Sequence, residues 1–215
     1  ENTLGLQAIT GTGAAIKTGV CTTKGVVGYD LTRLIIGSEG TLAVITQATL
    51  KLTPLPQAQR TLQAFYTDIR SATQAIAKIM AQPVIPSALE VIDGKALALI
   101  RQHHAQMAIP AEAQALLMIE VDGLKDCLEA GVRAVSQAAH QPGLLSLQEA
   151  QTEAQVKQLW AVRKALSPTL RHVAPNKINE DVVVPVSRIP DLIAGLEQLS
   201  QQFAIPIVNF GHAGN

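Results

Sequence analysis

The sequence predicts an α+β fold made of two parts that differ in pattern. Short segments rich in aliphatic and β-branched residues alternate with segments whose apolar residues recur at helical spacing. Glycine or proline separates most of these segments, and Pro54 and Pro56 follow the last strand of the first part. A chain of 215 residues can form one large domain or two small ones. We therefore expect one domain part at residues 1–56 and another at residues 57–215.

Residues 1–56 are expected to form strands joined by turns. The expected strands are residues 4–10, 14–20 and 41–52, and residues 29–36 are expected to form a short helix or turn. Glycines lie in the connections, where tight turns need them. This part should therefore be a small sheet with little helix.

Residues 57–215 alternate between strand and helix patterns. Strands are expected at residues 60–66, 88–92, 115–121, 178–184 and 205–210, and helices at residues 71–80, 94–103, 124–139, 153–173 and 189–203. Ser167-Pro168 should interrupt the longest helix, because proline lacks the N–H that an interior position donates. Few strands in a compact chain favour a ferredoxin-like antiparallel sheet, with helices packed on one face, over a doubly wound sheet.

The composition argues against several classes of protein. Lys plus Arg and Asp plus Glu are balanced at 17 each, without a basic block, so the chain has no electrostatic footprint for nucleic acid or an anionic membrane surface. No apolar run reaches the roughly 18 residues of a membrane helix. Cys21 and Cys127 lie far apart, which predicts reduced, buried thiols rather than a disulfide framework or a thiolate metal site. The chain starts at Glu1 without a signal-peptide pattern, and we expect a fragment of a longer protein.

Gly37-Ser38-Glu39-Gly40-Thr41 lies between a helix-like segment and a strand. Two glycines three positions apart permit positive φ and a close approach of the backbone to a ligand. Consecutive exposed N–H groups in such a turn can form an anion-binding nest. The spacing matches neither a Walker loop nor a GxGxxG motif, and a plain turn uses the same residues. Spacing alone therefore leaves a ligand-binding turn and a plain turn open.

Two segments in the last third of the chain carry candidate binding side chains. Arg163 and Ser167 are four residues apart on one face of the expected helix, and arginine offers a forked grip on a carboxylate. A solvated helix face has the same composition. His212 follows an apolar strand between Gly211 and Ala213, where binding residues often lie. A metal ligand and a hydrogen-bonded structural histidine are both open there.

Three stretches together resemble the FAD-linked oxidases of the vanillyl-alcohol oxidase type. The run from Gly28 to Leu42 is similar to the signature near the end of their FAD domain, and residues 44–52 continue the match. Leu159-Trp160 with Arg163, and residues 179–185, resemble the cap domain of the family. The tail at residues 209–215 is similar to the start of the cap's metal-binding motif. The resemblance covers essentially the whole chain and is strongest toward D-lactate dehydrogenases and the flavin subunit of glycolate oxidase.

The resemblance implies that residues 1–56 are the C-terminal part of an FAD-binding domain. The residues that would lie against FAD are Gly37, Glu39, Gly40 and Ile45, with Gly28 and Thr41 supporting the turn. The family's phosphate-binding loops would precede Glu1. Residues 57–215 would then be a substrate-binding cap, truncated at its C-terminus.

Within the cap, the resemblance implies that Arg163, Ser167 and Lys177 bind the substrate carboxylate. Asn179 competes with Lys177 for the position of the family lysine. His212 matches the first of two histidines that hold a divalent metal, zinc or manganese. The second histidine and a glutamate would follow Asn215.

The implied reaction is oxidation of a small D-2-hydroxy acid, D-lactate or glycolate, to the 2-oxo acid. A hydride would pass to FAD and the hydroxyl proton to a base, with the metal lowering the hydroxyl pKa. Arg163 would orient the carboxylate so that the carbinol C–H faces the flavin. The electrons would continue to an acceptor protein or a quinone. We expect a cytoplasmic protein, with peripheral contact to a membrane as an alternative, and a homodimer is left open.

Two other functions are open at this stage, and the fragment by itself is expected to be inactive. The chain could be a non-catalytic module that binds a carboxylate, or a flavoprotein oxidase of the same fold that acts on another alcohol. The flavin content of the full gene product separates the first from an enzyme. A comparison of substrates separates the second.

Overall fold

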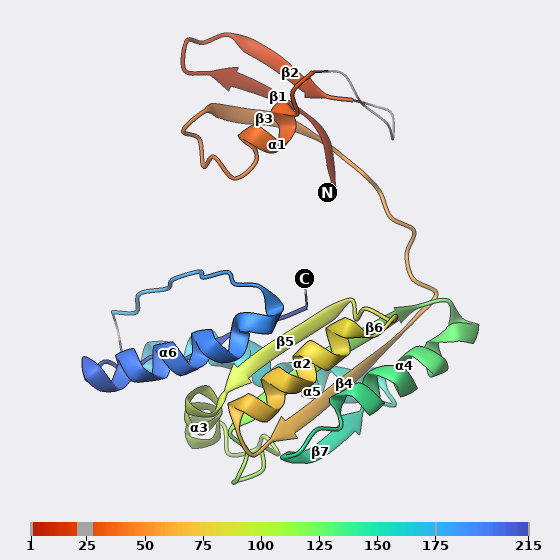
Figure 1. Ribbon diagram of the computed structural model, residues 1–215, viewed down its shortest axis with the longest axis vertical. Helices are drawn as coiled ribbons and strands as arrows, with labels where there is room; N and C mark the ends of the chain where they lie inside the picture. The colour runs from red at the N-terminus through yellow and green to blue at the C-terminus, as the bar shows by residue number, and fades with distance from the viewer. Residues whose placement is uncertain (1, 21–27, 175, 215) are drawn as a thin grey trace. The chain divides into compact units, whose positions relative to one another are not determined.

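The computed structural model describes residues 2–20, 28–174 and 176–214, and for Val173 the backbone alone. The chain forms two compact units, Glu1–Leu55 and Pro56–Asn215 (Figure 1). Both units combine antiparallel sheet with helix, which confirms the predicted α+β class. Their assignment as part of an FAD-binding domain and as a cap stays a prediction.

The first unit is a three-stranded antiparallel sheet with one short helix. Its strands are β1 (Thr3–Thr10), β2 (Ala15–Gly19) and β3 (Ala43–Leu50) in the order β2-β1-β3, and its helix is α1 (Leu31–Ile35). Asp30 begins the helix by accepting a hydrogen bond from the backbone N–H of Arg33 at 3.0 Å. The buried core is small and consists of Leu6, Ala8, Ile35 and Ala43. Nearly all of β3 is exposed within this unit.

The second unit is a five-stranded antiparallel sheet in the order β7-β4-β6-β5-β8. Its strands are β4 (Ala58–Tyr66), β5 (Ala88–Asp93), β6 (Ala115–Gly123), β7 (Leu144–Glu149) and β8 (Phe210–His212). Its helices are α2 (Ile69–Ala81), α3 (Gly94–His103), α4 (Lys125–Ala139), α5 (Glu153–Val173) and α6 (Ile189–Gln202), with a 3-10 turn at Val186–Arg188. Within the described residues, no helix has both the length and the apolar character needed to span a bilayer.

Helices cover both faces of this sheet, so the expectation of helices on one face was wrong. On one face α2 and α4 bury the side chains of Leu62, Leu117 and Ile119, while on the other α3 and α5 bury Leu116 and Met118. Figure 1 shows α2 and α4 in front of the strands and α5 behind them. The cause is visible in β6, whose apolar run Ala115–Ile119 places apolar side chains on both faces of one strand.

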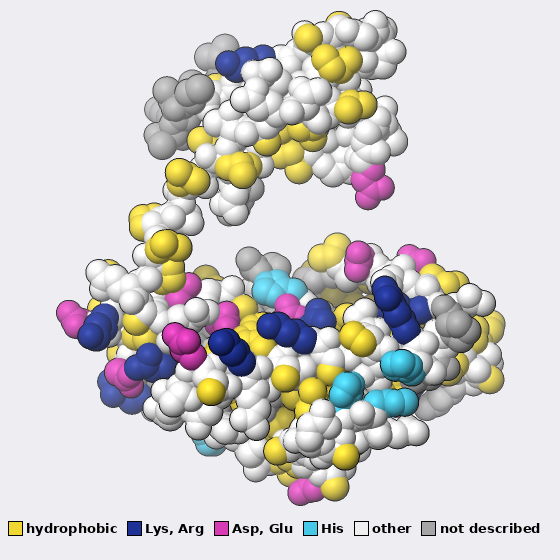
Figure 2. Space-filling model, turned by 180° about the vertical axis from the view of Figure 1, so that it is seen from behind, with side chains coloured by type: hydrophobic (Ala, Val, Ile, Leu, Met, Phe, Trp, Pro, Cys, Tyr) yellow, Lys and Arg dark blue, Asp and Glu magenta, His cyan; other side chains and the backbone are white. Residues whose placement is uncertain are grey.

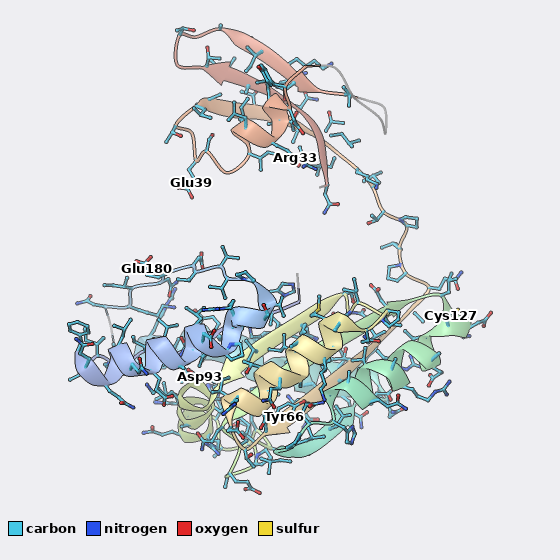
Figure 3. The ribbon with its side chains drawn as sticks, in the orientation of Figure 1. Arg33, Glu39, Tyr66, Asp93, Cys127 and Glu180 are labelled. Atoms are coloured by element: carbon cyan, nitrogen blue, oxygen red, sulfur yellow. The ribbon has the colours of Figure 1, made fainter. Side chains whose placement is uncertain are left out.

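Tyr66 ties β4 to the end of α4 on the first of these faces. The side chain is fully buried, and its hydroxyl donates a hydrogen bond to the carbonyl oxygen of Ala139 at 2.7 Å. Burial raises the pKa of the Tyr66 hydroxyl, so it stays a donor throughout the neutral range. Figure 3 labels this side chain.

The longest helix, α5, continues through Pro168, contrary to the predicted interruption. Leu166, Thr169 and Leu170 are buried around the proline, and α5 packs against α3 along this stretch. The Thr169 hydroxyl also donates to the carbonyl oxygen of Ala165 at 2.7 Å. Tertiary packing therefore holds the helix across the hydrogen bond that Pro168 cannot donate.

Three strand predictions differ from the structure. β7 was missed, although the alternation Leu145-Ser146-Leu147-Gln148 is a strand signal. The strand expected at residues 178–184 does not form: Ile178, Val182 and Val183 are exposed in a stretch without regular structure. The last strand covers Phe210–His212 rather than residues 205–210, because only this segment pairs with β5. A β-prone sequence becomes a strand only where a neighbouring strand can pair with it.

The prediction of buried thiols was wrong for Cys127, which is exposed near the start of α4. Cys21 lies outside the described residues.

Asp93 joins the end of β5 to α3 and to the segment that leads into β8 (Figure 3). One carboxylate oxygen accepts from the backbone N–H of Ala96 at 2.8 Å and caps α3. The other accepts from the backbone and side-chain N–H groups of Asn209 at 2.7 and 2.9 Å. Burial raises the pKa of Asp93, and the three hydrogen bonds oppose that rise. This one side chain therefore fixes where β8 begins.

Replacement of Asp93 by Asn keeps the volume of the side chain but puts an amide N–H₂ where an oxygen accepts. At least one of the three donors loses its acceptor, and we expect the free energy of unfolding of the second unit to fall by about 1–3 kcal/mol. Urea unfolding followed by the fluorescence of Trp160, the chain's one tryptophan, measures this loss. Asp122→Asn, at an exposed position of β6, is the matched control. Equal transition midpoints for both variants would contradict the role of Asp93.

Candidate functional site

The glycine turn of the first unit has an unusual backbone. Gly37 and Gly40 both have φ of 81°, in the left-handed region that favours glycine, and Glu39 between them has φ of 51°. The backbone N–H and hydroxyl of Thr41 both donate to the carbonyl oxygen of Ser38, at 2.9 and 2.6 Å, and close the turn. Glu39 lies at its tip (Figure 3). The turn leads directly into β3.

This turn borders an open hollow of about 390 Å³. The lining residues are Ile35, Gly37, Ser38, Glu39, Gly40, Ala43, Val44 and Ile45. Four of the six predicted cofactor residues are among them, while Thr41 closes the turn and Gly28, with φ of 83°, lies outside the lining. A Cβ atom built on Gly37 or Gly40 would meet no atom within 4 Å, so the backbone there is open to a ligand. The hollow therefore fits a group that approaches the backbone closely, as a flat cofactor ring does.

A cluster of charged side chains lies on the α5 side of the second unit. Arg163 of α5 donates from Nε to the Oε2 atom of Glu90 on β5, at 2.9 Å. The Oε1 atom of Glu90 lies 3.1 Å from Nδ1 of His212 on β8. The arginine also stacks on Phe210, with its Cζ atom 4.9 Å from the ring centroid. Three elements that are far apart in the sequence thus bring Arg163 and His212 to the same carboxylate.

The register of the sheet explains this meeting. Glu90 is paired with His212 and Ile92 with Phe210 across the antiparallel β5–β8 ladder. Because side chains alternate along a strand, these side chains project to the face that α5 covers. Figure 2, seen from the side opposite to Figure 1, shows Lys, Arg, Asp, Glu and His side chains interspersed on the second unit. The cluster therefore lies on a surface of mixed charge.

The other predicted substrate residues are not part of this contact. Ser167 is one turn beyond Arg163 on α5 and is exposed. Lys177 is half-buried in the stretch without regular structure that follows α5. Neither side chain makes a hydrogen bond within the described part of the chain. Their binding roles stay predictions.

A metal centre cannot be assembled from the described residues. Within residues 2–20, 28–174 and 176–214, no group of three His, Cys, Asp or Glu side chains is arranged to hold a metal ion. The carboxylate of Glu90, which lies 3.1 Å from His212 Nδ1, is also bound by Arg163. The assignment of His212 to a zinc or manganese site stays a prediction.

Glu90, Phe210 and Asp93 were not identified from the sequence. A signal for Glu90 existed, because a charged residue inside the apolar run ALEVID must be paired if the strand is buried. Asp93 could have been found as a helix cap before Gly94. Phe210 carried no signal beyond its place in an apolar segment.

Comparisons with known proteins agree with the fold. Residues 55–215 match the family described as FAD linked oxidases, C-terminal domain. The chain is 36% identical over 212 residues to the glycolate oxidase subunit GlcD of Bacillus subtilis. The aligned region covers 99% of this chain and 45% of that protein. It is 29% identical to a D-lactate dehydrogenase of Anaerostipes hadrus, over 95% of this chain and 44% of that protein. The chain therefore spans less than half the length of these relatives.

Among solved structures, 4-ethylphenol oxidase from Gulosibacter chungangensis is similar in fold, with a TM-score of 0.72 at 12% identity. The match covers 99% of this chain and 49% of that one. The fold and the family match agree with each other. The chain belongs to the family of FAD-linked oxidases, through their C-terminal domain. This confirms the resemblance noted in the sequence and agrees with FAD as the family's cofactor.

Proposed function

We propose that the full gene product is an FAD-dependent dehydrogenase or oxidase of small D-2-hydroxy acids, D-lactate or glycolate, and forms the 2-oxo acid. The observation that carries this proposal is Arg163, partly buried and fixed through Nε and its ring contact. Within the described residues, its two terminal Nη groups have no hydrogen-bond partner. Two parallel N–H donors match the geometry of a carboxylate. Glycolate and D-lactate, which appear in the relatives' names, are both 2-hydroxy carboxylates.

FAD, when bound, supplies the acceptor for the hydride that leaves the substrate's carbinol carbon. The residues proposed to hold it are Gly37, Glu39, Gly40 and Ile45 at the hollow, with Thr41 and Gly28 as support. The cap's part is to bind and orient the substrate through Arg163, with Ser167 and Lys177 as further candidates. The hydroxyl proton must go to a base, and the geometry identifies none of these residues as that base.

The partners and location of the protein are part of the same proposal. Two electrons taken from the substrate must leave the reduced flavin, and an acceptor protein or a quinone is proposed to receive them. A cytoplasmic location, with peripheral contact to a membrane as an alternative, accommodates either acceptor. A homodimer is compatible with the proposal but adds no residue to it.

The visible spectrum of the purified full gene product tests the proposal, followed by anaerobic addition of D-lactate, glycolate and D-2-hydroxyglutarate in separate samples. A flavin spectrum that bleaches with a 2-hydroxy acid supports it. A flavin that stays oxidised with all three points to another alcohol as the substrate. A colourless, folded protein that cannot be loaded with FAD contradicts the enzyme and leaves a carboxylate-binding module.

Arg163→Ala removes the fork and should lower kcat/KM for D-lactate about 10- to 100-fold, equivalent to about 1.4–2.8 kcal/mol of transition-state stabilisation. Steady-state kinetics per bound flavin measures it. Arg171→Ala is the matched control, because Arg171 is exposed on the same helix. A folded Arg163→Ala protein with wild-type kinetics would remove Arg163 from the site.

Gly40→Val forces a β-branched residue into the left-handed region, at a cost of about 1–2 kcal/mol. Because the turn must deform, we expect FAD affinity to fall about 5- to 30-fold. The dissociation constant, from quenching of flavin fluorescence on titration of the apoprotein, reports this. Gly11→Ala serves as control, because Gly11 does not have a positive φ and a Cβ atom built on it would meet no atom within 4 Å. Equal affinities for both variants would contradict a cofactor role for the turn.

A further inference from the structure

Glu90 is a partly buried carboxylate whose two oxygens are bound by different elements. Its side chain is 15% exposed, compared with 28% for Arg163 and 42% for His212. Oε2 accepts from Arg163 of α5, and Oε1 lies within hydrogen-bond distance of His212 of β8. Glu90 itself is in the interior of β5, between β6 and β8. A side chain fixed in this way can hold the orientation of a longer and more mobile one.

The contact with Glu90 decides which atoms of Arg163 can meet a ligand. An arginine can grip a carboxylate from the side, through Nε and one Nη, or end-on, through both Nη groups. Glu90 occupies Nε at 2.9 Å, and Phe210 packs against the guanidinium. The side-on grip is therefore taken by the protein's own carboxylate. The end-on pair remains for the substrate.

We infer that Glu90 is a positioning residue, which orients Arg163 so that its two Nη groups receive the substrate carboxylate end-on. This inference rests on the proposed oxidation of a 2-hydroxy acid. Glu90 contributes opposite effects to binding and to reaction. Its negative charge beside Arg163 weakens the attraction for an anion, whereas its hydrogen bond fixes the geometry in which that anion reacts.

These opposite effects give a signature that a merely structural residue would not show. In Glu90→Ala the guanidinium loses its anchor but also loses a neighbouring negative charge. We expect kcat with D-lactate to fall by about tenfold or more, as for other supporting hydrogen-bond partners. KM should stay unchanged or fall, since the net charge at Arg163 becomes more positive. Arg163→Ala, in contrast, should raise KM.

A conservative variant and a second readout support the test. Glu90→Gln keeps an oxygen that can accept from Arg163 Nε, so it should recover most of the lost kcat. Oxalate, an unreactive dicarboxylate, can be titrated into the oxidised full gene product while the flavin absorbance is followed. Its affinity should be unchanged or tighter in Glu90→Ala and weaker in Arg163→Ala.

Glu120→Ala is the matched control. Glu120 lies on the neighbouring strand β6 and accepts from the indole N–H of Trp160 on the same helix, at 2.8 Å, without contact to Arg163. It therefore links the sheet to α5 in the same manner but away from the fork. We expect its kcat per bound flavin to match the wild type, even if the protein unfolds at a lower temperature.

The possible results distinguish a failure of the role inferred for Glu90 from a failure of the proposed function. If wild-type flavin is not reduced by any 2-hydroxy acid, the proposed function fails and the inference fails with it. If the wild type reacts and Glu90→Ala reacts at the same rate per flavin, as Glu120→Ala does, the inference alone is overturned. A Glu90→Ala protein whose KM rises and whose oxalate affinity falls, as in Arg163→Ala, would also overturn it. A lower kcat with unchanged or tighter oxalate binding supports it.

Discussion

The packing of the second unit depends on two carboxylates of strand β5. Both need hydrogen-bond partners, because helices cover both faces of the sheet. Glu90 and Asp93 lie within an apolar strand where an unpaired charge is costly. Asp93 is satisfied by the cap of α3 and by Asn209, and Glu90 by Arg163 and His212. Two segments distant in sequence, α5 and β8, are thereby fixed against β5. The candidate substrate site is a consequence of this pairing.

The two units present different kinds of recognition. In the first, the turn at Gly37–Gly40 and the hollow beside it offer open backbone, aliphatic side chains and the polar side chains of Ser38 and Glu39. In the second, a fixed arginine offers two directed donors suited to a small anion. The flavin-dependent oxidation of a hydroxy acid that we propose for the full gene product would use both kinds.

The sequence predicted the class of the fold and most of its elements, because periodicity and capping are local properties. The helix at residues 94–103 was predicted with its bounds as they are, although the cap that Asp93 provides was not used. The errors lie where a distant partner decides. Residues 178–184 have strand propensity but no neighbouring strand, and Pro168 is tolerated because Leu166 and Leu170 are buried. The five consecutive apolar residues Ala115–Ile119 indicated that both faces of β6 are buried, but this signal was not used.

The same distinction holds for the site. Arg163, His212 and the glycine turn were candidates from the residues alone, their specific roles came from the resemblance to a family, and these roles stay predictions. Glu90 was missed because its meaning depends on the register that places it opposite His212 and beneath α5. Spacing along the chain does not reveal a contact between residues 90, 163 and 212. The one local sign of this role was that Glu90 is a charged residue within an apolar strand.

We propose that both Nη groups of Arg163 bind the carboxylate of the substrate end-on. The most direct test compares anaerobic flavin reduction by D-lactate and by its neutral amide, D-lactamide, in the full gene product and in Arg163→Ala. We predict that the wild type prefers the anion by about tenfold or more and that the variant reduces both at similar rates. An equal preference for D-lactate in both proteins would show that another group binds the carboxylate, and would contradict the claim.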